Sequence, residues 1–300
     1  MNSKFTRYLI LLIGLMCFSP RISAASGDLF VYPTPPDSMA NLQPRCDYII
    51  SRFWDRCNFE TAMIHADKFN TAFGDWISIM PMASADTVRN SITRLMKRFP
   101  KNPDVALKLA SMAEEWVYSD TSQIYSEDIF LPFAQAARDH KKINKADKAR
   151  FARSAKIIES SRLGATVPAV PIVYLDGTKG TLDDVTKGSI LLFFNDPDCS
   201  ECNIARVRLD IDFNANALID RGELTVVSIY PEAADPKWKE AAKDFNSKWV
   251  VCAMPDADEF FDMQGTPKFV FLDSHHRVLA KDMDIDYLLG AFQAANSLHK

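Results

Sequence analysis

Apolar residues in the first half of the chain recur at steps of three and four, the spacing of one face of a helix. This pattern runs from residue 42 to residue 57 and again from residue 84 to residue 99. The apolar positions are Leu42, Cys46, Ile49, Ile50, Phe53, Trp54 and Cys57 in the first stretch, and Val88, Ile92, Leu95 and Met96 in the second. We therefore predict a helix in each stretch.

Two further helices are predicted from their end signals. Asn102 and Pro103 stand where a cap and a first helical residue are expected. Another helix is predicted over Asn144–Arg162, and Gly164 follows it as a terminator. No strand pattern interrupts these stretches, so we predict a helical domain over residues 37–163.

From Pro168 onward, short apolar runs alternate with helical stretches. The runs that predict strands are PIVY, SILLFF, ELTVVSIY, KWVVCAM, KFVFLD and RVLAKD. Turns are predicted at Asp176-Gly177 and at residues 274–276. The stretch after Cys202 is interpreted as a helix that Gly222 ends, although it also alternates with a period of two. We thus expect an α+β protein, in which an all-α N-terminal domain precedes an α/β domain over residues 165–300.

The first residues have the pattern of a secretory signal peptide. Lys4 and Arg7 precede an apolar run over residues 8–18, and small residues follow near Ala24. The run is shorter than the about 20 residues that a membrane span needs. We predict that residues 1–24 are removed and that the protein is periplasmic or secreted.

A lipid anchor at Cys17 is the alternative to cleavage near Ala24. Met16 disfavours it, because a small residue is wanted directly before a lipidated cysteine. Removal of residues 1–24 takes away three of the 35 basic residues and no acid, which leaves 32 against 39 acidic residues and a net charge near −7. With no basic cluster, we expect no nucleic-acid partner.

Five of the six cysteines remain after that cleavage, which is too few for a disulfide-stapled small domain. In a continuous helix Cys46 and Cys57 are about 16 Å apart, at about 1.5 Å per residue. A disulfide needs Cα atoms within about 7 Å, so we predict two buried thiols. Cys252 lies in a predicted buried strand and is interpreted as a small apolar residue with a raised pKa.

Cys199 and Cys202 stand two residues apart directly after the apolar run SILLFF and a short polar turn. Such a pair is a redox site, part of a metal site or a structural disulfide. A zinc site needs about four ligands, and Cys252 with His275 or His276 are the candidates to complete it. Thiol-disulfide exchange is the favoured interpretation, while a structural disulfide stays open.

The chain resembles the thioredoxin fold in two motifs: the strand leading into Cys199-Ser200-Glu201-Cys202, and Gly265-Thr266-Pro267 directly before the strand KFVFLD. It is also similar to the TlpA/ResA-like branch, whose pattern before the central strand is matched by Asp176, Gly177, Thr181 and Leu182. The whole chain resembles secreted thioredoxin-like proteins of Bacteroidetes that carry a helical N-terminal domain.

The resemblance implies an exported disulfide reductase. A helix start favours a thiolate, so Cys199 attacks the client and Cys202 resolves the mixed disulfide. Pro267 is expected to be the cis-proline, beside which the backbone of Thr266 pairs with an extended client segment. Asp198, Ser200 and Glu201 are the predicted client-contacting residues around the pair. The expected partners are client proteins with disulfides and an upstream thiol donor, with a membrane-bound donor as one option; no cofactor or metal is expected.

Several residues depart from the family pattern. Asp198 stands where the family has tryptophan, and Asp196, Asp198 and Glu201 together oppose ionisation of the neighbouring thiol. Phe193 replaces the buried acid of thioredoxin, and Ala205 stands where some ResA-like proteins have glutamate. These departures favour a slow, partner-specific enzyme, or alternatively a non-enzymatic binding or scaffold protein.

Overall fold

The computed structural model describes residues 29–119, 121–263 and 265–298, so the predicted signal peptide and Cys17 lie outside the described residues. The chain divides into two compact units, of which one ends at Ser91 and the other begins at Ile92. This division between residues 91 and 92 does not fall at the predicted boundary near residue 164, so the predicted domains, 37–163 and 165–300, stay a prediction. None of the helices in the described part of the chain combines the length and apolar character that a membrane crossing requires.

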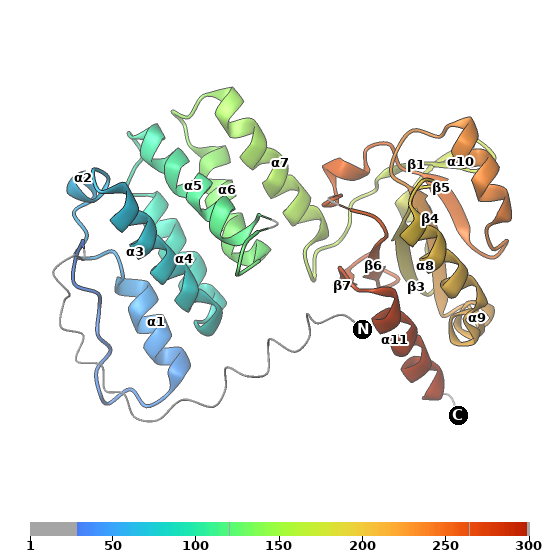
Figure 1. The fold of residues 1–300 in the computed structure, drawn as a ribbon, viewed down its shortest axis with the longest axis horizontal. Coiled ribbons are helices and arrows are strands. Elements are labelled where there is room, and N and C mark those ends of the chain that lie inside the picture. The colour runs from blue at the N-terminus through green and yellow to red at the C-terminus, as the bar shows by residue number, and fades with distance from the viewer. Residues whose placement is uncertain (1–28, 120, 264, 299–300) are drawn as a thin grey trace. The chain divides into compact units, whose positions relative to one another are not determined.

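The first unit contains the helices α1 (Leu42–Arg52), α2 (Phe59–Ala62) and α3 (Ala66–Ile79), and the start of α4 (Ala85–Met96) (Figure 1). Its core is aromatic: the rings of Trp54 and Trp76 lie 5.5 Å apart. The large side chains buried there are Phe53, Trp54, Phe69, Phe73 and Trp76.

The predicted continuous helix up to Cys57 is wrong. Helix α1 ends at Arg52, and a turn follows in which the N–H of Asp55 donates to the carbonyl of Arg52. Phe53 and Trp54 are both buried at this turn, so the apolar spacing continues although the helix has ended. Cys46 and Cys57 are both thiols, as predicted, but only Cys46 is buried; Cys57 lies beyond the helix and is half-buried.

The second unit begins with the helices α5 (Pro103–Val117), α6 (Glu127–Asp139) and α7 (Lys145–Ser161). Pro103 is the first residue of α5. Asn144 caps α7 by accepting a hydrogen bond from the N–H of Asp147 at 3.0 Å. Helices α3 and α6 were not predicted; in α6 the interior Pro132 interrupts the helical signal.

Within the described residues the second unit also holds a seven-stranded sheet in the order β2-β1-β5-β4-β3-β6-β7. The strands are β1 (Pro171–Tyr174), β2 (Lys179–Thr181), β3 (Ser189–Phe194), β4 (Leu224–Tyr230), β5 (Val250–Ala253), β6 (Lys268–Leu272) and β7 (Val278–Lys281). Strands β3, β4 and β5 are parallel, whereas β1, β6 and β7 pair antiparallel with their neighbours. The predicted strands and both predicted hairpins are confirmed.

The helices of this domain are α8 (Ser200–Ile211), α9 (Phe213–Asp220), α10 (Pro236–Ala241) and α11 (Ile285–Ser297). The predicted helix after Cys202 is two helices, because Asp212 ends α8 and caps α9 by accepting the N–H of Ala215 at 2.7 Å. Gly222 follows α9 with a φ of 75°, a left-handed conformation that glycine adopts readily.

Strand β3 is buried on both faces of the sheet. Ile190, Leu192 and Phe194 face one apolar cluster. Leu191 and Phe193 face the other, together with side chains of α8 and α11. Figure 1 shows where these two helices lie along the sheet. Because β3 is covered on both sides, its carboxyl end is fixed in position, and the two cysteines follow directly from that end.

Helices α6 and α7 are joined to the sheet domain by ion pairs. Lys281 on β7 pairs with Glu127 at the start of α6 at 2.6 Å, and their side chains are only 12% and 9% exposed. On α7, Arg153 and Lys156 pair with Asp258 and Glu259, which precede β6, and both pairs are exposed. The buried pair is the one expected to matter for stability.

We predict that Lys281→Met lowers the free energy of unfolding by about 3 kcal/mol, because it leaves the buried carboxylate of Glu127 unpaired. The double variant Glu127→Leu/Lys281→Met should regain most of that loss, since it buries no charge. Urea unfolding followed by tryptophan fluorescence measures both.

The matched control is Lys243→Met, which breaks an exposed pair with Glu240 and should cost at most about 1 kcal/mol. A double variant as unstable as Lys281→Met would contradict the importance of the unpaired charge.

Candidate redox site

A tight turn carries the chain from β3 to the first cysteine. The carboxylate of Asp196 accepts the N–H of Asp198 at 2.7 Å, and the N–H of Cys199 donates to the carbonyl of Asp196 at 3.1 Å. The side-chain amide of Asn203 donates to the carbonyl of Pro197 at 3.3 Å. Aspartate favours such turns because its side chain hydrogen-bonds the backbone two residues on, and proline favours them because its φ is fixed. The turn places Cys199 at the N-cap of α8.

Cys199 and Cys202 form a disulfide, with Cα atoms 5.2 Å apart. Cys199 is half-buried, whereas Cys202 is only 2% exposed, so Cys199 is the more accessible of the two. The N–H of Cys202 lies 3.0 Å from the sulfur of Cys199. After reduction this N–H, one of the free donors at the helix start, is placed to stabilise a Cys199 thiolate.

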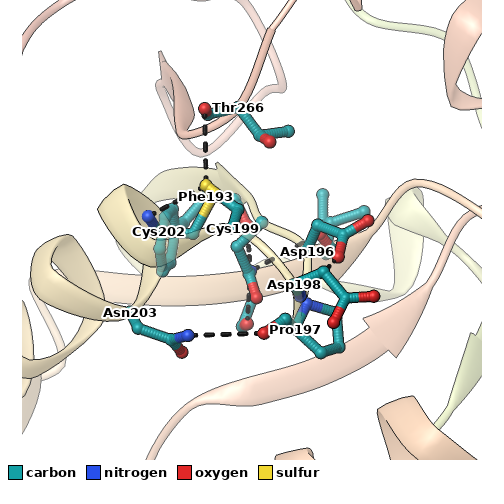
Figure 2. Close-up of a disulfide and its surroundings, with 11 residues drawn as sticks. Phe193, Asp196, Pro197, Asp198, Cys199, Cys202, Asn203 and Thr266 are labelled. Carbon is teal, nitrogen blue, oxygen red and sulfur yellow. Dashed lines mark hydrogen bonds between the residues drawn. A yellow bond between two sulfur atoms is a disulfide. The ribbon is translucent and has the colours of Figure 1, made fainter.

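The loop before β6 approaches the disulfide from a second side (Figure 2). Its Thr266–Pro267 peptide bond is cis, as predicted. The carbonyl oxygen of Thr266 lies 3.5 Å from the sulfur of Cys199. In the disulfide the sulfur carries no proton, so this is a van der Waals contact and not a hydrogen bond. In the reduced protein the thiol of Cys199 can donate a hydrogen bond to the same oxygen.

A groove of about 590 Å³ lies beside this loop. It is lined by Glu201, Ile204, Ala205, Gly265, Thr266, Pro267, Lys268, Phe269, Asp282, Met283, Asp284 and Ile285. Among the predicted site residues, the structure thus brings Glu201, Thr266 and Pro267 to one groove next to the cysteines. Ser200, the first residue of α8, is exposed, and neither it nor Asp198 lines the groove. The side chain of Asp198 instead pairs with a residue on another helix.

That partner is Lys237 on α10, which the sequence did not indicate. Its ammonium group contacts both carboxylate oxygens of Asp198. The hydrogen bond to Asp198 raises the pKa of Lys237, with further contributions from the charges of Asp196 and Asp235. Thus one of the three acids that were expected to oppose ionisation of Cys199 has a counter-charge. The two partners are 39 positions apart in the sequence, and no periodic signal links them.

The two positions beneath the cysteines are apolar. Phe193 is fully buried and stacks on Phe269 with ring centroids 5.0 Å apart. Ala205 is 3% exposed in the same cluster. Neither side chain can take up or release a proton, so these positions do not supply the acid that thioredoxin uses.

The residues considered as zinc ligands do not gather. Cys252 lies on β5, which the sheet order separates from the β6–β7 hairpin of His275 and His276 by two strands. A ring nitrogen of His276 lies 2.8 Å from the carbonyl of Val185. Across residues 29–298, leaving aside 120 and 264, no group of three or more His, Cys, Asp or Glu side chains is arranged to hold a metal ion.

Comparison with known proteins adds to this geometry. The chain is similar to the crystal structure of a thioredoxin-like protein from Bacteroides caccae, with 22% identity and a TM-score of 0.68, over 88% of this chain and 98% of that one. The C-terminal domain has a thioredoxin-like fold. The predicted fold class, a helical N-terminal part followed by a thioredoxin-like domain, is confirmed.

Residues 17–161 match the family described as Domain of unknown function (DUF5106), and this match ends at the last residue of α7. About 45% of the chain is similar to the C-terminal domain of an uncharacterized protein from Bacteroides fragilis, at 26% identity, 99% coverage of that chain and a TM-score of 0.42. The same share is similar to the thioredoxin domain of a thiol-disulfide oxidoreductase from Bacteroides vulgatus, at 23% identity, 99% coverage of that chain and a TM-score of 0.40. A comparison with curated proteins finds no match.

Cys252 is completely buried, and burial raises the pKa of its thiol to about 12 from the ordinary value of 9.0. A raised pKa in the folded state gives stability that is present below pH 9 and is lost as the pH rises toward 12. We predict that the stability advantage of the wild type over Cys252→Ala shrinks by about 2 kcal/mol between pH 8 and about pH 10.5.

Urea unfolding at the two pH values measures this difference. Val250→Ala, on the same strand, is the control and should show the same difference at both. A pH-independent difference for Cys252→Ala would mean that the thiol titrates normally. Exchange activity should be unchanged in Cys252→Ala, because the buried thiol is not a nucleophile near neutral pH.

Proposed function

We propose that this protein is an exported thiol-disulfide oxidoreductase that acts as a partner-specific disulfide reductase. The observation that carries the proposal is the disulfide of Cys199 and Cys202 at the start of α8, in contact with the Thr266–Pro267 loop. A disulfide with one half-buried and one buried sulfur has an attacking side and a resolving side.

The reaction begins with the reduced pair. The thiolate of Cys199 attacks one sulfur of a client disulfide, and the client's other sulfur leaves as a thiolate. The thiolate of Cys202 then attacks the sulfur of Cys199 and releases the client's first cysteine. Two electrons pass to the client, and the Cys199–Cys202 disulfide remains. An upstream dithiol donor, soluble or membrane-bound, must reduce it again.

The client is expected to lie in the groove beside Pro267. An extended segment there can pair with the backbone of Thr266 and contact Glu201, which also lines the groove. Asp198 and Ser200 flank the accessible sulfur and complete the surface that a client meets. The groove is open and has apolar side chains at its base, including Phe269 and Met283, which suits a polypeptide rather than a small thiol.

Slow and selective exchange is proposed because Phe193 and Ala205 offer no proton acceptor beneath the cysteines. Resolution then depends on solvent or on groups of the client to take up protons. The TlpA/ResA-like character, export and the reducing direction rest on the resemblance described above. The helical region is proposed to recognise clients, since α6 and α7 are joined to the segments on either side of β6.

We predict that Cys202→Ser traps mixed disulfides between Cys199 and client proteins, because the resolving thiol is removed. Non-reducing gels and mass spectrometry of periplasmic extracts measure the trapped species. Cys199→Ser is the matched control and should trap none, since Cys202 is buried. Equal trapping by both variants would contradict the assigned roles.

The scaffold alternative is separated by an insulin-reduction assay with a dithiol donor. We expect a rate above the donor's background that is lost in Cys199→Ser. No rate with insulin, together with no trapped client in Cys202→Ser, would favour a binding protein. If alkylation shows that the pair never cycles between strong oxidant and strong reductant, the reductase proposal fails.

A further inference from the structure

Lys237 forms an ion pair with the residue that directly precedes the accessible cysteine. Its ammonium nitrogen lies 2.5 Å from one carboxylate oxygen of Asp198 and also contacts the other. The two side chains are 64% and 73% exposed. An exposed pair adds little stability, so its significance lies in the charge that it presents near Cys199.

The fold fixes Lys237 in this place. Trp238 is 1% exposed and stacks on Tyr230 at the end of β4, with ring centroids 5.8 Å apart. Asp235 caps α10 by accepting the N–H of Trp238 at 2.7 Å. Strand β4 runs parallel to β3, so their carboxyl ends share one edge of the sheet. Helix α10 is thus anchored beside the turn that carries Asp198.

The turn fixes Asp198 as well. Its backbone N–H donates to the carboxylate of Asp196 at 2.7 Å, which holds the backbone of the turn in place. Figure 2 shows Asp196 and Asp198 together on one side of the disulfide. Two carboxylates are therefore held in the turn that directly precedes Cys199.

The turn before Cys199 and the elements around it carry several charged groups. They are Asp196 and Asp198 in the turn, Glu201 on α8, Asp235 and Lys237 on α10, and Lys268 after the Thr266–Pro267 loop. Lys268 pairs with Asp282 at 2.8 Å. Among these groups, Lys237 is the cation whose partner is the acid adjacent to Cys199.

We propose that Lys237 is a positioning residue that holds Asp198 and offsets its charge, so that Cys199 ionises more readily than three neighbouring acids would allow. This inference rests on the proposed function only in taking Cys199 as the nucleophile. It explains how tryptophan can be replaced by aspartate before the first cysteine without the loss of a reactive thiolate.

The test is the pH dependence of Cys199 alkylation by iodoacetamide in the fully reduced, full-length chain. Lys237→Gln leaves the charge of Asp198 uncompensated and should raise the midpoint by about half a pH unit at low ionic strength. Asp198→Asn leaves the ammonium alone and should lower the midpoint by a similar amount. The double variant should return close to the wild type, and 0.5 M salt should shrink every shift.

Two controls separate charge from structure. Lys237→Arg keeps the charge and should keep the wild-type midpoint. Lys248→Gln breaks a comparable exposed pair with Asp220, away from the cysteines, and should leave the midpoint unchanged. Cys202 modification is followed separately by peptide mapping.

The proposal is overturned by any of three results: a midpoint in Lys237→Gln within 0.1 unit of the wild type, an equal shift in Lys237→Arg, or single variants that shift in the same direction. Alkylation requires no client, so it can succeed where insulin reduction and client trapping fail. The charge compensation would then stand while the proposed reductase function falls.

Discussion

The placement of the redox pair depends on the junction between the buried strand β3 and helix α8. Apolar clusters on both faces of the sheet hold β3 in place. The hydrogen bonds that Asp196 makes in the following turn then fix the position of Cys199 relative to the end of β3. The helix then begins with the free N–H of Cys202 directed at the sulfur of Cys199. A sulfur held at that point needs no loop motion to meet the Thr266–Pro267 loop, because β6 is paired with the same strand.

The sheet also brings together groups that lie far apart in the sequence. Parallel pairing of β3 and β4 puts their carboxyl ends at one edge, which brings α10 with Lys237 to the turn of Asp198. Antiparallel pairing of β3 with β6 brings Pro267 to the same edge. The chemistry of the site is therefore assembled at one end of three neighbouring strands, with an apolar floor of Phe193 and Phe269.

Ion pairs connect helices α6 and α7 to β7 and to the segment before β6. The buried pair of Glu127 and Lys281 holds α6 against β7, next to Asp282 in the groove wall. Arg153 and Lys156 hold the segment that leads toward the Thr266–Pro267 loop. A partner bound to α6 or α7 would act on segments that border the groove, which is a physical route by which the helical region can influence client choice.

Local pattern determined much of this protein. The period of apolar residues predicted helix α4, end signals predicted α5 and α7, and short apolar runs predicted every strand of the sheet except β2. The cysteine spacing and the Thr266–Pro267 motif were enough to identify the candidate site residues. Short-range pattern failed after Arg52, where helix α1 ends although the apolar spacing continues, and in α6, where the interior Pro132 interrupts the helical signal. Only the tertiary structure decided that Asp198 has Lys237 as its partner, that Glu201 faces a groove, and that Cys252 is remote from both histidines, since strand order joins or separates such residues and no local spacing records it.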